Sequence, residues 1–135
     1  MPVRILMVDD FEPFRRLIHS TLEKTAGLLV VCEVSDGFEA VRKAEELQPD
    51  LILLDIGLPR LNGIEAARRI RKLAPESKIL FLSVESDVEL VQEAMSLGAL
   101  GYVDKAHAVG ELLTAVEAVR QGRKFVSSGL SPVCC

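Results

Sequence analysis

Short, continuous apolar runs alternate along the chain with longer segments of mixed polarity. These runs are of strand length and rich in leucine and β-branched residues: Val3–Val8, Leu29–Val34, Leu51–Leu54, Ile79–Ser83 and Leu100–Val103. Strands that are apolar on both faces are typical of a parallel sheet covered by helices on both sides. The runs therefore predict five parallel strands.

The segments between and after these runs place apolar residues at helical spacing. In the first segment, the residues of one helix face are Phe14, Leu17, Ile18 and Leu22. The other helical segments are Ala40–Leu47, Ile64–Leu73, Val88–Leu97 and Leu112–Val119. Five strand-then-helix units predict a doubly wound α/β fold, a three-layer sandwich with right-handed crossovers.

Glycines follow three of the helical segments. Gly27, Gly98 and Gly122 lie where a left-handed residue commonly ends a helix. The periodic pattern stops after Gly122, and the sequence SSGLSP that follows shortly after is typical of a linker. We therefore expect one domain over residues 1–122 and a C-terminal linker or tail over residues 123–135.

Composition narrows the class of protein. The 135 residues are 49% hydrophobic and 27% charged, which is the balance of a globular domain. The formal net charge of −4 argues against this stretch binding nucleic acid by itself, because such binding depends on clustered lysine and arginine. No apolar run is long enough for a membrane span and the start has no signal-peptide layout, so a cytoplasmic protein is expected.

The three cysteines do not suggest a disulfide framework. Cys32 lies inside an apolar run, where a buried reduced thiol is expected. Cys134 and Cys135 close the chain and fit an exposed tail, because two adjacent cysteines do not easily chelate one metal without further ligands.

Polar residues stand at the ends of four of the five predicted strands. The first run ends on Asp9 and Asp10, the third on Asp55 and the fourth on Ser83, and the fifth continues to Lys105. In an open parallel sheet, ligands bind at the carboxyl ends of the strands. Three carboxylates, a hydroxyl and an ammonium are therefore expected to meet at one side of the sheet.

Each of these residues also has a plain structural interpretation when taken alone. Asp10 or Asp36 fits a helix N-cap, Ser83 a turn hydroxyl and Lys105 a solvated surface lysine. Capping does not explain why an acid pair, an acid, a hydroxyl and a lysine follow strands one, three, four and five in that order. The set as a whole favours a functional site.

Four motifs, in this order, resemble the receiver domain of two-component response regulators. They are Asp9-Asp10, then Asp55 with Pro59 and Gly63 in DIGLPRLNG, then Ser83 in LFLSV, and finally Tyr102 and Lys105 in GALGYVDK. The resemblance covers residues 3 to about 122. It implies a flavodoxin-like (CheY-like) five-stranded parallel sheet with strand order 2-1-3-4-5.

The resemblance also implies a chemistry for the strand-end residues. Asp55 would be the phosphoacceptor, and Lys105 and Ser83 would contact the phosphoryl oxygens. Mg²⁺ would be bound by Asp10, Asp55 and the backbone carbonyl of Gly57, with Asp9 acting through water. Ser83 and Tyr102 would form the switch that alters a surface of the fourth helix, fifth strand and fifth helix. Such a module is not an enzyme in the usual sense, since it catalyses only its own phosphorylation and dephosphorylation.

The chain departs from the family pattern at three positions. Lys105 is followed by Ala106, where many receivers have a proline with a cis bond, which leaves cis or trans open here. Gly57 offers no side chain to shield a phosphoryl group, and Ser83 stands where threonine is also used. These positions bear on the lifetime of the phosphorylated state.

The family resemblance indicates the partners. A sensor histidine kinase or phosphotransfer protein would supply the phosphoryl group, and a homodimer is possible. GALGYVDK and the ending AVRQGRKFVS resemble LuxR/NarL-type regulators, in which DNA is bound through a C-terminal domain that is not present in this chain. No membrane partner is expected.

Five alternatives remain for comparison, of which a binding-only pseudo-receiver is disfavoured because the full acidic set is intact. One is a standalone receiver, and another is a phosphatase of the haloacid-dehalogenase type, which carries its nucleophile on the first strand as DxD. A flavin-binding module is disfavoured because the first strand-to-helix turn is acidic. His19 could suggest a histidine phosphotransfer domain, but it lies in the first helix of an α/β chain rather than in a helical bundle.

Overall fold

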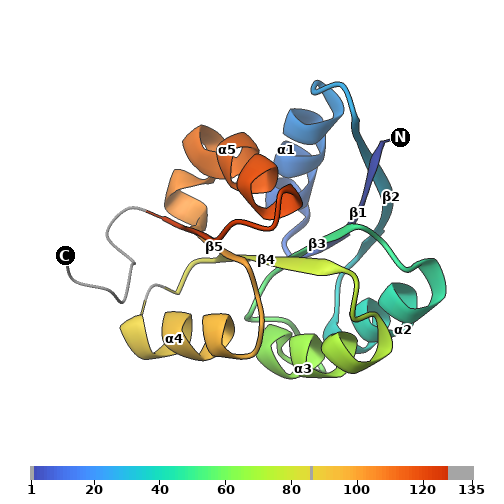
Figure 1. The fold of residues 1–135 in the computed structure, drawn as a ribbon, viewed down its shortest axis with the longest axis vertical. Coiled ribbons are helices and arrows are strands. Elements are labelled where there is room, and N and C mark those ends of the chain that lie inside the picture. Colours follow the sequence, from blue (N-terminus) through green and yellow to red (C-terminus); the bar gives the residue numbers. More distant parts are fainter. Residues whose placement is uncertain (1, 86, 128–135) are drawn as a thin grey trace.

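The computed structural model describes residues 2–85 and 87–127, in which strands and helices alternate (Figure 1). The strands are β1 (Val3–Val8), β2 (Leu28–Val34), β3 (Leu51–Leu54), β4 (Lys78–Ser83), β5 (Gly101–Asp104) and β6 (Phe125–Val126). The helices are α1 (Glu12–Glu23), α2 (Gly37–Leu47), α3 (Gly63–Leu73), α4 (Val88–Ser96) and α5 (Ala108–Arg120), and a short 3-10 turn, η1 (Lys105–His107), precedes α5.

All strands run parallel, in the order β2-β1-β3-β4-β5-β6. Helices α1 and α5 cover one face of this sheet, and α2, α3 and α4 cover the other (Figure 1). The prediction of a three-layer α/β sandwich of the flavodoxin-like type, with order 2-1-3-4-5 for the first five strands, is confirmed.

The continuous apolar runs form strands because both faces of the sheet are buried. Alternate residues of β1 illustrate this: Ile5 and Met7 pack in the cluster with α1 and α5, whereas Leu6 and Val8 pack in the cluster with α2, α3 and α4. Successive side chains of a strand point to opposite faces. Two hydrophobic cores therefore hold the middle of the sheet, and its carboxyl ends are left for polar residues.

The prediction of five strands is wrong by one, because β6 adds a sixth. Phe125 and Val126 lie in the residues assigned to the tail, and they pair in parallel with Gly101 and Tyr102 of β5. Phe125 packs on one hydrophobic cluster and Val126 on the other. Two apolar residues are too few to show a strand period, so the pattern of the sequence does not reveal this element. The boundary at residue 122 itself stays a prediction.

Several predicted turns are confirmed. Gly27, Gly98 and Gly122 have φ values of +89°, +111° and +80°. Asp36 caps α2, since its Oδ1 accepts a hydrogen bond from the Glu39 N–H at 2.9 Å. The bond between Lys105 and Ala106 is trans.

The structure describes one of the three cysteines, and its helices can be compared with the length of a membrane span. Cys32 is a free thiol, half-buried and packed against the core. Cys134 and Cys135 lie outside the described residues. Within residues 2–85 and 87–127, no helix has the length and apolar character that crossing a bilayer requires.

Candidate functional site

The sheet brings the predicted strand-end residues to one side of the molecule. Asp9 follows β1, Asp55 follows β3, Ser83 ends β4 and Lys105 follows β5. The backbone carries this alignment, because the Asp55 N–H donates to the Val8 carbonyl at 3.0 Å and Ser83 is in register with Asp104. The expectation that these groups converge at the carboxyl ends of the strands agrees with the structure.

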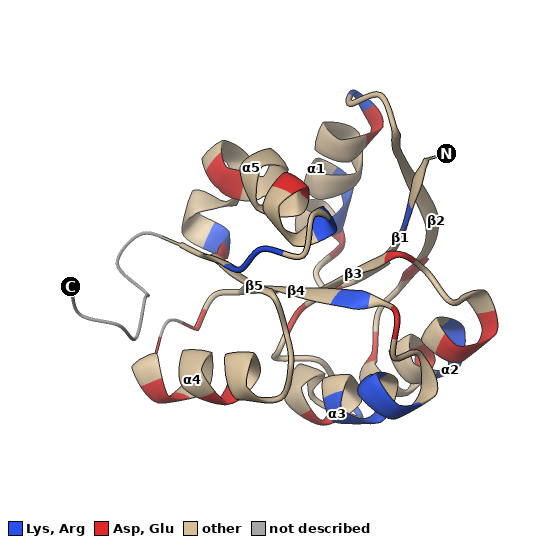
Figure 2. Cartoon of the chain, viewed as in Figure 1, with Lys and Arg blue, Asp and Glu red and all other residues tan. Residues whose placement is uncertain are grey.

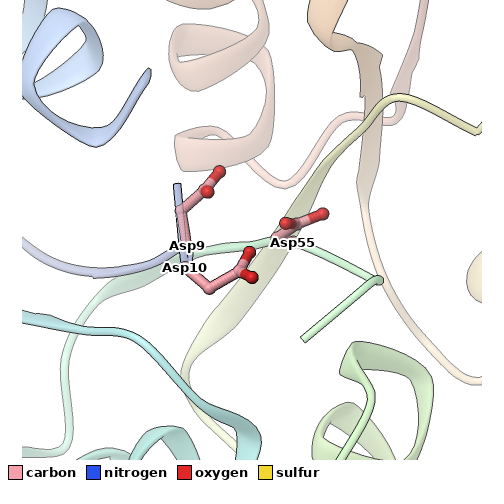
Figure 3. A group of neighbouring side chains, drawn as sticks. All are labelled: Asp9, Asp10 and Asp55. Atoms are coloured by element: carbon pink, nitrogen blue, oxygen red, sulfur yellow. The ribbon is translucent and has the colours of Figure 1, made fainter. Parts of the chain in front are cut away.

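Three carboxylates form the centre of this site. Oxygen atoms of Asp9, Asp10 and Asp55 all lie within 4.8 Å of one another, and the carboxylate of Asp10 points toward Asp55 (Figure 3). Asp9 and Asp55 are only 3% and 6% exposed, whereas Asp10 is exposed. Asp10 does not cap α1, because Phe11 occupies the N-cap position. Its carboxylate is therefore available to a ligand.

The ammonium of Lys105 lies between the two buried carboxylates. Lys105 Nζ is 3.2 Å from Asp55 Oδ2, with which it forms a hydrogen bond, and 2.6 Å from Asp9 Oδ2. The second contact is an ion pair, and Asp9 Oδ2 is a buried oxygen that accepts no hydrogen bond. Asp9 Oδ1 accepts a hydrogen bond from the Phe11 N–H at 2.8 Å. One lysine thus only partly compensates the acidic group.

Burial raises the pKa of the Asp55 carboxyl above its usual range. The Lys105 ammonium opposes this effect, and the negative charge of Asp9 adds to it. The ionised form of Asp55 is therefore costly in the absence of a further positive charge. A divalent cation with oxygen ligands fits this donor set, because it would compensate the charge of the carboxylates that Lys105 alone does not balance.

The loop after Asp55 is held close to the sheet by glycine. A Cβ atom on Gly63 would lie 2.0 Å from the Asp55 carbonyl oxygen, so only glycine lets the first residue of α3 approach this closely. The Gly63 N–H also donates to the Ile56 carbonyl at 2.7 Å. Gly57, in contrast, is exposed, and a Cβ atom there would meet no atom within 4 Å. The loop is thus tight at Gly63 and open at Gly57.

Ser83 and Tyr102 meet at Glu85. The Ser83 hydroxyl oxygen accepts a hydrogen bond from the Glu85 N–H at 3.0 Å, and the Tyr102 hydroxyl donates to the Glu85 carbonyl at 2.7 Å. Tyr102 is completely buried, and this burial raises the pKa of its phenol, which keeps the donor protonated. The two side chains named as a switch therefore hold the same residue of the β4–α4 loop, one through its N–H and the other through its carbonyl.

Two further residues contact the site although no motif marks them. Arg15 of α1 donates to the Asp9 carbonyl oxygen at 2.6 Å and to Glu33 at 3.1 Å, which fixes the β1–α1 turn. The ring of Phe14 lies 4.6 Å from Lys105 Nζ. A helical period shows only that Phe14 faces inward, and an arginine on a helix is too common to be a signal.

Two other titratable residues, His19 and Asp104, make structural contacts of their own. His19 lies on α1 between Glu23 and Glu33, at 3.0 and 2.5 Å. Asp104 caps η1 through a hydrogen bond from the Ala106 N–H at 2.9 Å, which fixes the backbone beside Lys105.

A cleft of about 540 Å³ opens over the site. Acidic groups and Lys105 form its floor, and apolar side chains contribute to its rim: Phe11, Phe14 and Val84. The basic residues grouped on α3 (Figure 2) do not line this cleft, and Arg68 and Arg69 are paired with glutamates. The cleft therefore combines a cation-binding acidic group with a positive charge for an anion.

Known proteins are similar to this chain in sequence and in fold. Residues 5–117 match the model of the response regulator receiver domain family. The chain is 33% identical over 129 residues to the response regulator UvrY of Escherichia coli (strain K12), covering 96% of this chain and 59% of UvrY. It is 35% identical over 124 residues to the transcriptional regulatory protein DegU of Brevibacillus brevis, covering 92% of this chain and 52% of DegU. The chain thus spans between half and three fifths of these curated relatives.

Two solved structures extend the comparison. A LuxR-family two-component response regulator from Aurantimonas sp. SI85-9A1 superposes with a TM-score of 0.91 at 35% identity, covering 96% of this chain and 93% of that one. The response regulator domain of Thermotoga maritima CheB gives a TM-score of 0.84 at 32% identity, covering 90% and 98%. With a family model matched over most of its length, the chain belongs to the receiver domains of two-component response regulators, with relatives of the LuxR/NarL type.

Proposed function

We propose that the chain accepts a phosphoryl group on the carboxylate of Asp55 and passes the change to a protein-binding surface. The observation that supports this most directly is the buried Asp55 carboxylate, bonded to Lys105 and flanked by two further acids at the floor of an open cleft. The donor is a sensor histidine kinase or a phosphotransfer protein, as the family membership suggests.

Asp55 acts as the nucleophile in this transfer. One of its carboxylate oxygens attacks phosphorus, the bond from phosphorus to the donor nitrogen breaks, and the electron pair leaves with that nitrogen. Lys105 then moves its ammonium from the carboxylates to a phosphoryl oxygen, and the Ser83 hydroxyl donates to another. The product is an acyl phosphate held by this chain's own groups.

Mg²⁺ is the metal that we assign to the acidic group. Asp10, Asp55 and the backbone carbonyl of Gly57 would hold it, and Asp9 would contribute through water. When bound, it supplies positive charge that lets an anionic phosphoryl donor approach three carboxylates. The Asp9 Oδ2 atom, which accepts no hydrogen bond, and the raised pKa of Asp55 support this assignment.

The signal passes through the β4–α4 loop. Movement of the Ser83 hydroxyl toward the phosphoryl group breaks its bond to Glu85, the residue that also holds the Tyr102 hydroxyl. The equilibrium of the surface formed by α4, β5 and α5 would shift as a consequence. In a longer parent protein, this surface would control transcription through a DNA-binding domain, as the name of the relative DegU, a transcriptional regulatory protein, suggests. Exposed apolar residues on α1 and α5 would support a homodimer.

A phosphorylation assay tests this proposal. The chain is incubated with Mg²⁺ and acetyl phosphate, and its intact mass is expected to gain one phosphoryl group, whereas Asp55→Asn is not labelled and a chelator prevents labelling. Asp87→Asn is a matched control, because Asp87 only caps α4 and asparagine caps equally well. Unchanged labelling of Asp55→Asn would refute the assignment, and turnover of a small phosphate ester without an adduct would indicate a phosphatase.

A further inference from the structure

The ring of Phe14 is the apolar neighbour of the Lys105 ammonium. Phe14 lies in the first turn of α1, is half-buried and packs on the cluster of α1 and α5. Lys105 Nζ lies over its ring at 4.6 Å from the centroid. A cation within about 6 Å of a ring centroid is attracted by the negative face of the ring.

The contact with the ring matters because the flexible aliphatic chain of Lys105 does not by itself determine the position of the ammonium. A lysine side chain is a flexible four-carbon chain ending in a compact charge. Asp104 fixes the backbone at the start of η1, but the position of Nζ depends on what surrounds it. Two carboxylates attract Nζ on one side, at 2.6 and 3.2 Å, and the Phe14 ring supports it on another. Lys105 is in consequence only 11% exposed.

We propose that Phe14 is a positioning residue for Lys105. Its ring face holds the ammonium over the site and favours the position that the ammonium takes beside the phosphoryl group. This inference rests on the proposed function, in which Lys105 binds a phosphoryl oxygen. It assigns to Phe14 an electrostatic contribution of the ring that a leucine of similar packing would not supply.

Ring electronics separate this contribution from packing. Phe14 is replaced by leucine, by tyrosine, and by phenylalanines with one, two or three ring fluorines, which weaken the negative face at nearly constant size. The affinity for trifluoroberyllate with Mg²⁺ and the rate of labelling by acetyl phosphate are measured, because neither requires a protein partner. We expect tyrosine to stay within about twofold of the native chain, leucine to lose roughly three- to tenfold, and affinity to fall stepwise with each fluorine.

The position of the lysine gives a second, spectroscopic readout. Protons of the Lys105 side chain above an aromatic face should resonate upfield in the NMR spectrum, and this shift should disappear in Phe14→Leu. Phe38→Leu is the matched control: Phe38 also carries a guanidinium over its ring, that of Arg60 at 5.4 Å, but it lies on α2 and does not line the cleft. Its replacement should leave trifluoroberyllate affinity unchanged.

Each other outcome overturns the inference. If all fluorinated variants bind like the native chain while leucine binds less well, Phe14 acts through packing alone. If leucine and the fluorinated variants all match the native chain in both measurements, Phe14 does not position Lys105. If the native chain binds no trifluoroberyllate, the proposed function fails and this inference fails with it.

Discussion

Replacing Ser127 with alanine tests whether β6 is part of the folded receiver domain. Ser127 is completely buried, and its hydroxyl makes two hydrogen bonds. It donates to Glu111 Oε1 of α5 at 2.5 Å and accepts from the Asp104 N–H at 2.9 Å. The hydroxyl thus joins the segment after α5 both to that helix and to β5.

The expected loss of stability follows from these two bonds. A hydrogen bond to a charged group contributes about 1.5–3 kcal/mol, and one between neutral groups about 1 kcal/mol. Because Glu111 and Asp104 are half-buried, water reaches the groups left unpaired only in part, and Ser127→Ala should destabilise the chain by roughly 2–4 kcal/mol. At roughly 3 °C per kcal/mol for a domain of this size, the melting temperature should fall by about 6–12 °C.

Urea unfolding followed by circular dichroism measures this change. Ser96→Ala is the control, because the Ser96 hydroxyl donates only to Glu93 within α4 and is exposed; its effect should stay within about 0.5 kcal/mol. Glu111→Gln keeps an acceptor for Ser127 and should lose less than Ser127→Ala. If Ser127→Ala unfolds at the same urea concentration as the native chain, the two hydrogen bonds that tie the end of β6 to α5 and β5 do not stabilise the domain.

The remaining predictions concern the strand-end site. Asp55→Asn should raise the melting temperature in chelator at neutral pH, because burial raises the pKa of Asp55 in the folded chain and its ionised form therefore opposes folding. This gain in melting temperature should shrink as the pH falls toward and below the usual aspartate range, because the carboxyl then becomes protonated in both the folded and the unfolded chain. Equal melting temperatures at all pH values would contradict this. Gly57→Asn should fold normally, because a Cβ atom added at this position meets no atom within 4 Å. The asparagine side chain should shield the acyl phosphate on Asp55 from water and slow its hydrolysis. An unchanged rate of decay of the labelled protein would contradict this shielding. Tyr102→Phe should cost about 0.5–1.5 kcal/mol in urea unfolding, since the Glu85 carbonyl loses its donor, and a neutral result would mean that water replaces the phenol.

The apolar runs and their endings account for most of what could be predicted. Continuous runs such as Leu51–Leu54 need both faces of a sheet buried, which fixes helices on either side, and a parallel sheet places all strand ends together. Asp9, Asp55, Ser83 and Lys105 could therefore be placed near one another before any coordinates. The family resemblance added the strand order and the chemical roles.

Contacts between elements could not be predicted in the same way. Arg15 reaches the Asp9 carbonyl, and Phe14 reaches Lys105, because α1 packs at one particular angle on the sheet. Neither spacing nor residue type encodes that angle. For Asp10, both capping and ligation agreed with the sequence, and the position of Phe11 at the N-cap excludes capping of α1. Strand β6 was too short to produce a pattern.

The two-residue strand β6 also decides how another protein can approach the sheet. Within the described residues, β2 has a neighbour on one side only, so it offers seven residues of backbone to a strand from a second chain. On the other side, β6 occupies the free flank of β5 at Gly101 and Tyr102, and Ser127 uses the Tyr102 carbonyl. Strand addition along β5 would require β6 to leave first. Recognition along β5 would accordingly depend on side chains rather than on backbone hydrogen bonds.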